Sequence, residues 1–117
     1  MVATGVPRDP VAYRGTTYTI GQANNALIYP GLGLGSMAVD ARLVTDEMIS
    51  AAAHALGAFL TPEEKGAAVI PPVARIEEFS AAVAVAVATC AVQQGLNRRS
   101  VTDVKAAVEE MIWKTTY

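Results

Sequence analysis

The feature that most constrains the fold is an uncharged apolar run from Ala81 to Val92, built mainly of alanine and valine. The run continues a helical spacing of apolar residues after Pro71-Pro72, so we expect one helix from Val73 or Ala74 to near Gly95. Because its second half is apolar on every side, this helix should be buried all round. The run is shorter than the ~20 residues that span a bilayer. The expected packing face comprises Ile76, Phe79, Val83, Ala86, Val87 and Cys90.

Two further helices are expected before this one. Proline is tolerated only in the first turn of a regular helix, so the first should run from about Pro30 to Arg42. Thr45 is a typical N-cap of the second, and Asp46 and Glu47 place favourable negative charge in its first turn. His54 is expected at the surface or packed, without a catalytic role. The predicted apolar face of the second helix comprises Ile49, Ala52, Ala53, Leu56, Phe59 and Leu60.

Helical signals recur in two other places. Thr61-Pro62-Glu63-Glu64 forms a capping box with proline at the first helical position, which predicts a short helical turn that Gly66 ends. A last helix should begin at Ser100 or Thr102. Its expected inward residues are Val104, Val108, Met111 and Ile112, with Trp113 and Tyr117 as aromatic anchors.

The N-terminal part carries strand signals instead. Met1 to Ala3 has the character of a strand end, and the turn sequence Thr4-Gly5-Val6-Pro7 follows. Val11 with Tyr13, and Tyr18 with Ile20, alternate about Arg14-Gly15-Thr16, which is typical of a β-hairpin. A hairpin of two strands is marginally stable alone, so it should pack against another part. The expected fold is therefore mainly α with a short N-terminal β-hairpin.

The segment from Ile20 to Ser36 is the predicted functional site. It contains an amide cluster of Gln22, Asn24 and Asn25, which we place at a loop-to-helix junction. Amides both donate and accept hydrogen bonds without charge, so a pair of them is suited to hold a polar ligand. One of the two asparagines is alternatively explained as a helix N-cap.

Glycines alternate in the same segment, and Gly33-x-Gly35-x-x-Ala38 matches the spacing of a dinucleotide-binding fingerprint. A true fingerprint joins a strand to a helix and is followed by a second strand and an acidic residue. Helical signals follow here, and Pro30 stands where the strand should enter the turn. We therefore interpret these glycines as permitting close helix packing.

Composition narrows the class of protein. With 52% hydrophobic and 17% charged residues and a mean hydropathy of +0.31, the chain of 117 residues is apolar for its size. Such a composition suits a piece of a larger protein or a subunit with a large interface, and it predicts self-association. A net charge of −2 without basic runs argues against nucleic acid or an anionic membrane as partner. The single Cys90 and the turn sequence after Met1, which is no signal peptide, predict a cytoplasmic protein.

The sequence offers little catalytic chemistry. No serine, cysteine or threonine has the context of an activated nucleophile, and no set of residues has the spacing of metal ligands. The paired carboxylates Glu63-Glu64, Glu77-Glu78 and Glu109-Glu110 fall early in helices or on solvated faces. We therefore predict no catalytic and no metal-binding residue in this chain.

Several motifs together resemble the C-terminal part of the malic enzyme family. They are Thr4-Gly5-x-Pro7, Gly21-Gln22-Ala23-Asn24-Asn25, Pro30-Gly31, the segment from Thr45 to His54, and Pro71-Pro72. The likeness to the bacterial malolactic enzymes of this family is greatest through Ile20 to Gly35 and Gly66 to Val73. The asparagine pair is specific, and the resemblance covers essentially the whole chain.

The resemblance implies the C-terminal fragment of an α/β, Rossmann-like NAD-binding domain. Residues 1–117 would form its C-terminal part, with a strand end and hairpin in 1–23 and helices in 24–117. The implied enzyme uses NAD and Mn²⁺ or Mg²⁺ to convert L-malate into L-lactate and CO₂, or oxidatively into pyruvate. Asn24 and Asn25 would lie beside the nicotinamide ribose and the malate carboxylate, and Thr4 and Gly5 would contact the cofactor.

The resemblance also implies what the chain lacks. The family's acid, base, metal-binding carboxylates and cofactor fingerprint all lie upstream of the matching motifs, so we expect this chain alone to be inactive. The expected partners are L-malate and further copies of the protein, as a homo-oligomer. The alternative is a non-catalytic helical module for self-association or partner binding, and the choice between lactate and pyruvate stays open.

Overall fold

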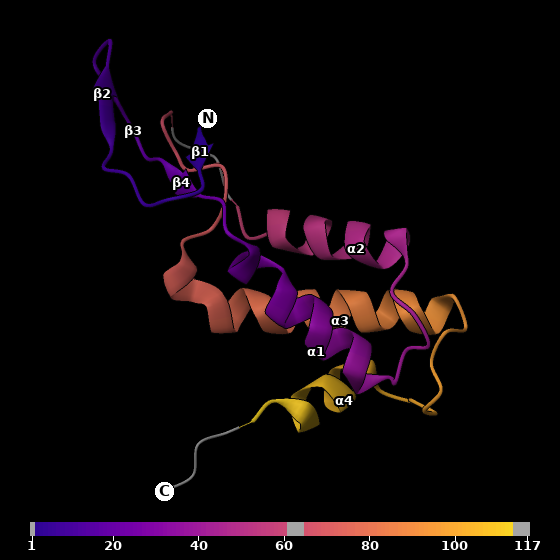
Figure 1. Cartoon of the computed structure of the whole chain (residues 1–117). Helices are drawn as coiled ribbons and strands as arrows, with labels where there is room; N and C mark the ends of the chain where they lie inside the picture. The colour runs from indigo at the N-terminus through magenta and orange to yellow at the C-terminus, as the bar shows by residue number, and fades with distance from the viewer. Residues whose placement is uncertain (1, 61–64, 114–117) are drawn as a thin grey trace, which may run out of the picture.

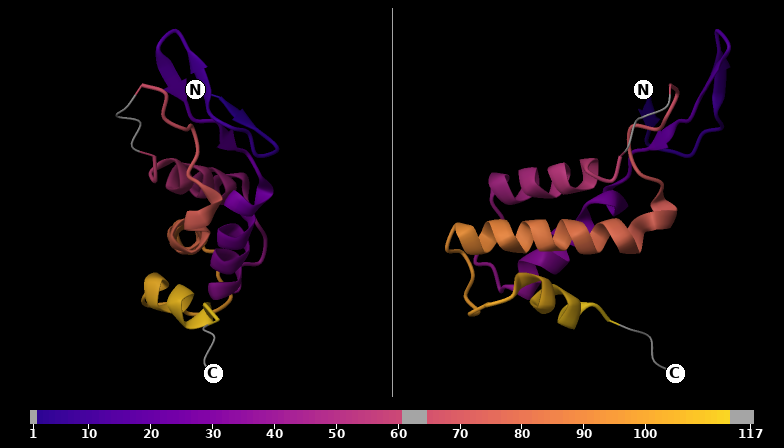
Figure 2. Two further views of the ribbon diagram at one scale, coloured as in Figure 1. Left: turned by 90° about the vertical axis from the view of Figure 1, so that its left-hand side faces the viewer. Right: turned by 180° about the vertical axis from the view of Figure 1, so that it is seen from behind.

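The computed structural model describes residues 2–60 and 65–113. The long helix α3 (Ile76–Gln93) packs against α1 (Tyr29–Ala38), α2 (Asp46–Gly57) and α4 (Val104–Met111), as Figure 1 shows. Two short 3₁₀ helices, η1 (Asn25–Leu27) and η2 (Val73–Arg75), precede α1 and α3. The strands β1 (Ala3–Thr4), β2 (Val11–Tyr13), β3 (Thr16–Tyr18) and β4 (Gly21–Gln22) lie together at one end of the molecule (Figure 2). The predicted fold class, mainly helical with a short N-terminal hairpin, is confirmed.

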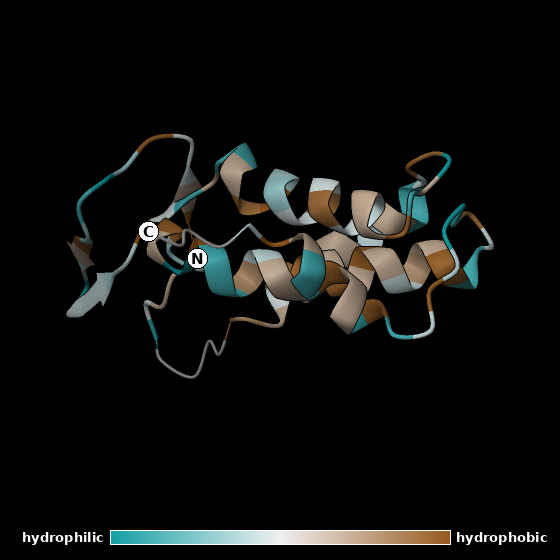
Figure 3. Cartoon of the chain, turned by 90° about the horizontal axis from the view of Figure 1, so that it is seen from below, coloured by the Kyte–Doolittle hydropathy of each residue, from teal (hydrophilic) through white to brown (hydrophobic). Residues whose placement is uncertain are grey.

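Burial of α3 follows its apolar composition. Every residue from Phe79 to Val92 is buried or half-buried, as the sequence predicts. The hydrophobic turns of the packed helices are brown in Figure 3. With η2 included, Val73–Gln93 spans 21 residues with a hydropathy of 1.4, enough by these two measures to cross a membrane. The core helix of a globular domain has the same length and composition, and here three other helices pack around it.

Two glycines bring α1 unusually close to α3. A Cβ added to Gly31 would lie 2.6 Å from the Cβ of Val83, and one added to Gly35 would lie 2.9 Å from the Cβ of Val87 and overlap the Ala84 carbonyl oxygen. A Cβ on Gly33 would meet nothing within 4 Å. All three glycines lie inside α1 and not at a strand-to-helix turn, so the interpretation as a packing device is confirmed for Gly31 and Gly35, but not for Gly33.

The end of α1 differs from the prediction, because the helix stops at Ala38 and not at Arg42. Asp40 adopts a left-handed φ of 49°, and two backbone hydrogen bonds close the last turn in a Schellman motif. The end of α3 is closed in the same way, with Gly95 at a φ of 67°. The Arg42 N–H then donates to the carbonyl of Leu96 at 3.0 Å, so the two helix ends are joined.

The N-cap of α2 is predicted correctly, and its buried face only in part. The hydroxyl oxygen of Thr45 accepts a hydrogen bond from the Met48 N–H at 3.2 Å. Met48 and Ala52 are fully buried, whereas Ile49 is 45% exposed and Ala53 is also exposed. Placing Ile49 and Ala53 on the inner face was therefore wrong, because α2 is turned toward α3 through the neighbouring Met48. Phe59, just after the helix, packs edge to face on Phe79, with ring centroids 6.4 Å apart.

The last helix also starts and packs differently from the prediction. Asp103, and not Ser100 or Thr102, caps α4, since its carboxylate accepts from the Ala106 N–H at 3.0 Å. Val108 is buried as expected, but Met111 is 40% exposed and Trp113 is 80% exposed. Trp113 is therefore no anchor within the described part of the chain. The predictions for Thr61-Pro62-Glu63-Glu64, Met1 and Tyr117 fall outside the described residues.

The predicted hairpin is confirmed as β2 paired antiparallel with β3. Arg14 and Gly15 form its turn with positive φ values of 48° and 76°, and Ile20 lies beyond it. The hairpin extends away from the helices and contacts the segment before α3, where the Thr19 N–H donates to the Gly66 carbonyl at 2.8 Å. Gln22 lies in a strand, β4, where the sequence suggested a loop-to-helix junction.

The glycines of α1 provide a direct test of the helix contact. Gly35→Ala should destabilise the chain by about 1 to 3 kcal/mol, because the added methyl group forces α1 away from α3. The matched change Gly33→Ala, into open space on the same helix, should stabilise it by about 0.5 to 1 kcal/mol through helix propensity. Urea denaturation followed by circular dichroism measures both, and equal stability of the two variants would contradict the close contact.

Candidate functional site

The predicted site residues follow the ends of two adjacent parallel strands. β1 pairs with β4 in parallel, with Thr4 opposite Gln22. The Ala23 N–H donates to the carbonyl of Thr4 at 2.8 Å, which fixes the end of one strand against the other. Gly5 and the asparagine pair therefore leave the sheet at the same edge. In open α/β sheets, ligands bind at this edge, outside the carboxyl ends of the strands.

We call Thr4, Gly5, Asn24 and Asn25, which lie at this edge, the corner. Within the corner, Asn24 has a structural function. It is the N-cap of η1 in extended conformation, and its side-chain oxygen accepts a hydrogen bond from the Ala26 N–H at 2.9 Å. The sequence left open which asparagine of the pair acts as a cap, and the structure assigns the cap to Asn24. The side chain is exposed, so its amide nitrogen still offers two donors to a ligand.

Both the nitrogen and the oxygen of the Asn25 side-chain amide can bind a ligand. It is the first residue of η1, its side chain is exposed, and no side-chain hydrogen bond joins it to another residue in the described part of the chain. Its backbone carbonyl is occupied, accepting from the Ile28 N–H at 3.1 Å. The side-chain amide can thus donate to one ligand atom and accept from another.

Thr4 and Gly5 complete the corner. The hydroxyl of Thr4 donates to the carbonyl of Val6 at 2.8 Å and shapes the turn after β1. A Cβ added to Gly5 would meet nothing within 4 Å, so packing within the described residues does not require a glycine there. The same open space gives a ligand room to approach the backbone.

The ionisable groups with altered pKa values, and His54, lie on helices away from this corner. Among the residues described, no three His, Cys, Asp or Glu side chains are grouped so that they could hold a metal ion. The pKa of Glu78 is lowered by its hydrogen bonds and ion pair with Arg75, and that of Glu47 by hydrogen bonds to its own backbone and to Gln94. Both are exposed in the first turns of helices, and His54 is an exposed residue bonded to Ser50. These groups stabilise local structure.

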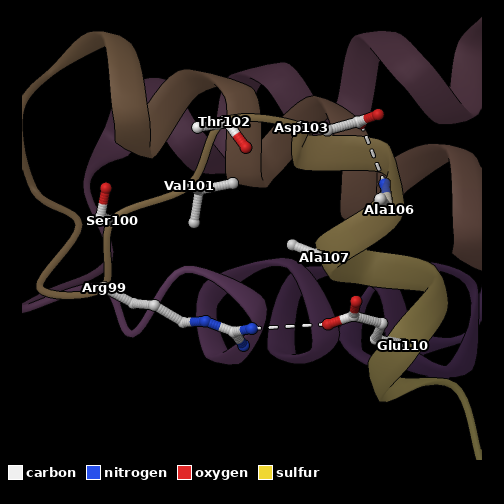
Figure 4. Close-up of a pocket in the computed structure, with 8 residues that line it drawn as sticks. All are labelled: Arg99, Ser100, Val101, Thr102, Asp103, Ala106, Ala107 and Glu110. Carbon is white, nitrogen blue, oxygen red and sulfur yellow. Dashed lines mark hydrogen bonds and ion pairs between the residues drawn. The ribbon is translucent and has the colours of Figure 1, made fainter.

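A separate recess of about 140 Å³ lies beside the start of α4 (Figure 4). Its charged groups already serve the fold, because Asp103 caps the helix and Arg99 pairs with Glu110 at 3.4 Å. It shares no residue with the corner at the strand ends. We therefore assign it no ligand.

A larger recess of about 310 Å³ adjoins the corner, and the sequence patterns did not predict this recess. Gln22, which the amide cluster pointed to, lines it together with Arg8. No spacing or motif marks Arg8, because part of the wall comes from residues 68–73, nearly fifty positions after Gln22. That part of the wall includes Ala68, Ile70, Pro71, Pro72 and Val73.

Comparisons with known proteins agree on one family. A model of the malic enzyme NAD-binding domain matches residues 1–92. The chain is 52% identical over 117 residues to a malolactic enzyme of Leuconostoc mesenteroides, covering all of this chain and 22% of the relative. It is 41% identical over 117 residues to NAD-dependent malic enzyme 3 of Bacillus subtilis, covering 21% of that protein.

A solved structure agrees with the sequence comparisons. The malic enzyme of Pyrococcus horikoshii Ot3 superposes with a TM-score of 0.75 at 33% identity, covering 96% of this chain and 23% of that one. The chain thus spans about a fifth of the length of the relatives that it matches.

The different roles of Asn24 and Asn25 in the fold can be tested by the stability of their variants. Asn24→Ala should destabilise the chain by about 1 kcal/mol, because it removes the cap of η1, while Asn24→Asp should be nearly neutral. Asn25→Ala should leave the melting temperature unchanged, since its side chain is exposed and holds no part of the fold. Thermal melts of the three variants decide, and a larger loss for Asn25→Ala than for Asn24→Ala would reverse the assignment.

Proposed function

The chain belongs to the malic enzyme family, whose NAD-binding domain it matches, and we propose that it is the C-terminal segment of an NAD-dependent enzyme that decarboxylates L-malate. In this proposal residues 1–117 are the C-terminal part of that domain, with a strand end and hairpin in 1–23 and mainly helices in 24–117. The observation that carries the proposal is the corner itself. Exposed amides and an open glycine follow the carboxyl ends of two paired parallel strands.

NAD and malate fit the chemistry of this corner. When bound, NAD supplies the acceptor for the hydride on the hydroxyl-bearing carbon of malate. We propose that Asn25 donates to an oxygen of malate and accepts from a ribose hydroxyl, and that Asn24 donates through its free amide nitrogen. Thr4 and Gly5 give the backbone that borders the cofactor, and open space beside Gly5 leaves it room.

A divalent metal does not fit these residues. Mg²⁺ and Mn²⁺ prefer carboxylate and other oxygen ligands, and the corner offers amides without a carboxylate. No candidate cluster of metal ligands exists in the described part of the chain either. We therefore propose that any Mn²⁺ or Mg²⁺ of the complete enzyme, together with its acid and base, is held by residues outside this chain.

Relative similarity favours one of the two reactions. The chain is 52% and 50% identical to malolactic enzymes of Leuconostoc mesenteroides and Lactiplantibacillus plantarum, against 41% to the Bacillus subtilis malic enzyme. We therefore propose L-lactate and CO₂ as the products. The full-length protein should then form both in equal amounts from L-malate with NAD, without accumulating NADH. Pyruvate with equimolar NADH would assign the oxidative reaction instead.

A second candidate function rests on the exposed apolar side chains. Ile49 and Met111 are exposed on the outer helices and Trp113 is exposed just beyond α4, and surfaces of this kind favour association with another protein. A free-standing chain of this sequence would then be a non-catalytic module that self-associates or binds a partner. The natural open reading frame and the intact mass of the protein separate this alternative from the enzyme.

The chain by itself should not decarboxylate malate. With NAD and Mn²⁺ supplied, we expect no lactate and no pyruvate above background, because the corner can bind but has no group that transfers the proton or polarises the substrate. The assay follows both products by chromatography, with the full-length enzyme as the positive control. Turnover that co-purifies with the 117-residue chain would refute the expectation.

Asn25 should be tested in the full-length enzyme. Asn25→Asp should raise the KM for malate more than Asn25→Ala, because it places a negative charge near a dianion while alanine only removes contacts. The unchanged melting temperature of both variants is the control for folding. An Asp variant as active as the parent would exclude the ligand role, because a residue that serves the fold alone would tolerate the change.

A further inference from the structure

The recess beside β4 has the properties of a small-molecule site. Its volume of about 310 Å³ lies at the lower end of the range for ligand pockets, and its walls are mostly apolar with a few polar groups, as in such pockets. Three stretches of the chain form it, namely residues 7–8, residues 19–22 at β4, and residues 68–73 before α3. The lining residues used below are Arg8, Thr19, Ile20, Gln22, Ile70 and Val73.

Arg8 differs from the other arginines of the chain. Of the six, it alone has no ion pair, hydrogen bond or aromatic contact in the part of the chain that the structure describes. Arg8 is exposed and lines the recess. The other arginines contact Tyr13 (Arg14), the Gly95 carbonyl (Arg42), Glu78 (Arg75), Asp40 (Arg98) and Glu110 (Arg99).

We infer that this recess binds the carboxylate of a small organic acid on Arg8. A guanidinium presents its donors in a planar fork that matches a carboxylate. The amide of Gln22 and the hydroxyl of Thr19 add hydrogen-bonding groups on the same walls, and Ile20, Ile70 and Val73 supply apolar surface for the carbon chain. Four-carbon acids such as L-malate and succinate fit this description.

The position of the recess relates it to the candidate site. Gln22 lines the recess and lies opposite Thr4 in the strand pair, two residues before Asn24. The choice of four-carbon acids rests on the proposed function, whereas the carboxylate site rests on Arg8 and the recess. The acid bound there is either the reacting malate or a second, non-reacting acid, and both share the same carboxylate chemistry.

Calorimetric titration of the full-length protein with succinate, and with L-malate in the absence of NAD, tests the inference. Arg8→Gln should weaken binding of at least one acid about tenfold or more, the loss expected for a charge-assisted hydrogen bond. Arg8→Lys should retain part of the affinity. Arg14→Gln is the matched control, because it removes another exposed arginine from the same region. Melting curves verify that all variants fold.

Each outcome has a definite meaning. Succinate that competes with malate in steady-state kinetics identifies the reacting acid as the ligand, and Arg8-dependent binding without competition identifies a second acid. Equal affinities in Arg8→Gln and Arg14→Gln, or no binding of either acid by the parent protein, overturn the inference. If Arg8→Gln changes neither malate turnover nor acid binding, the carboxylate site is overturned and the proposed function is left standing. Absent turnover with Arg8-dependent binding overturns the proposed function and leaves the inference standing.

Discussion

The close contact of α1 with α3 is the interaction on which the candidate site depends. Gly31 and Gly35 remove the side chains that would hold the two backbones apart, so α1 lies directly on Val83 and Val87. The same helix follows η1 after the single residue Ile28, whose carbonyl accepts a hydrogen bond from the Leu32 N–H at 2.9 Å. The packed helix pair therefore sets where the asparagines emerge, although neither asparagine is itself buried.

The strand end of the site is held by a different contact. The segment before α3 passes beside the strands, where Gly66 accepts from Thr19 and Ile70 lies against Gly21. A Cβ on Gly21 would lie 2.6 Å from the Cγ1 atom of Ile70, so a larger residue would displace this segment. Two sets of glycine contacts thus position the corner, one between the helices and one at the strands.

Local signals in the sequence predicted local structure well. The hairpin turn at Arg14-Gly15, the Thr45 cap and the burial of α3 each depend on neighbouring residues, and the structure has all three. The end of α1 was missed because Asp40, which is not a glycine, takes the left-handed conformation that closes the helix, and because Arg42 bonds to Leu96, a residue distant in sequence. The candidate corner was foreseen as an amide cluster, but its pairing with β1 and the recess at Arg8 depend on tertiary contacts that no local pattern encodes.

The errors on the outer helices have a common physical origin. Periodic apolar residues mark the surface that is buried in the whole protein, not only the surface buried within one segment. On α3, which is covered by three helices, the pattern and the observed burial agree. On α2 and α4, which lie at the periphery, Ile49 and Met111 continue the apolar pattern yet are exposed. The matched relatives are about five times longer than this chain. In a chain that matches only a fifth of such proteins, apolar residues without a partner inside the matching part are therefore expected mainly on the peripheral helices, and there the apolar pattern and the observed burial disagree.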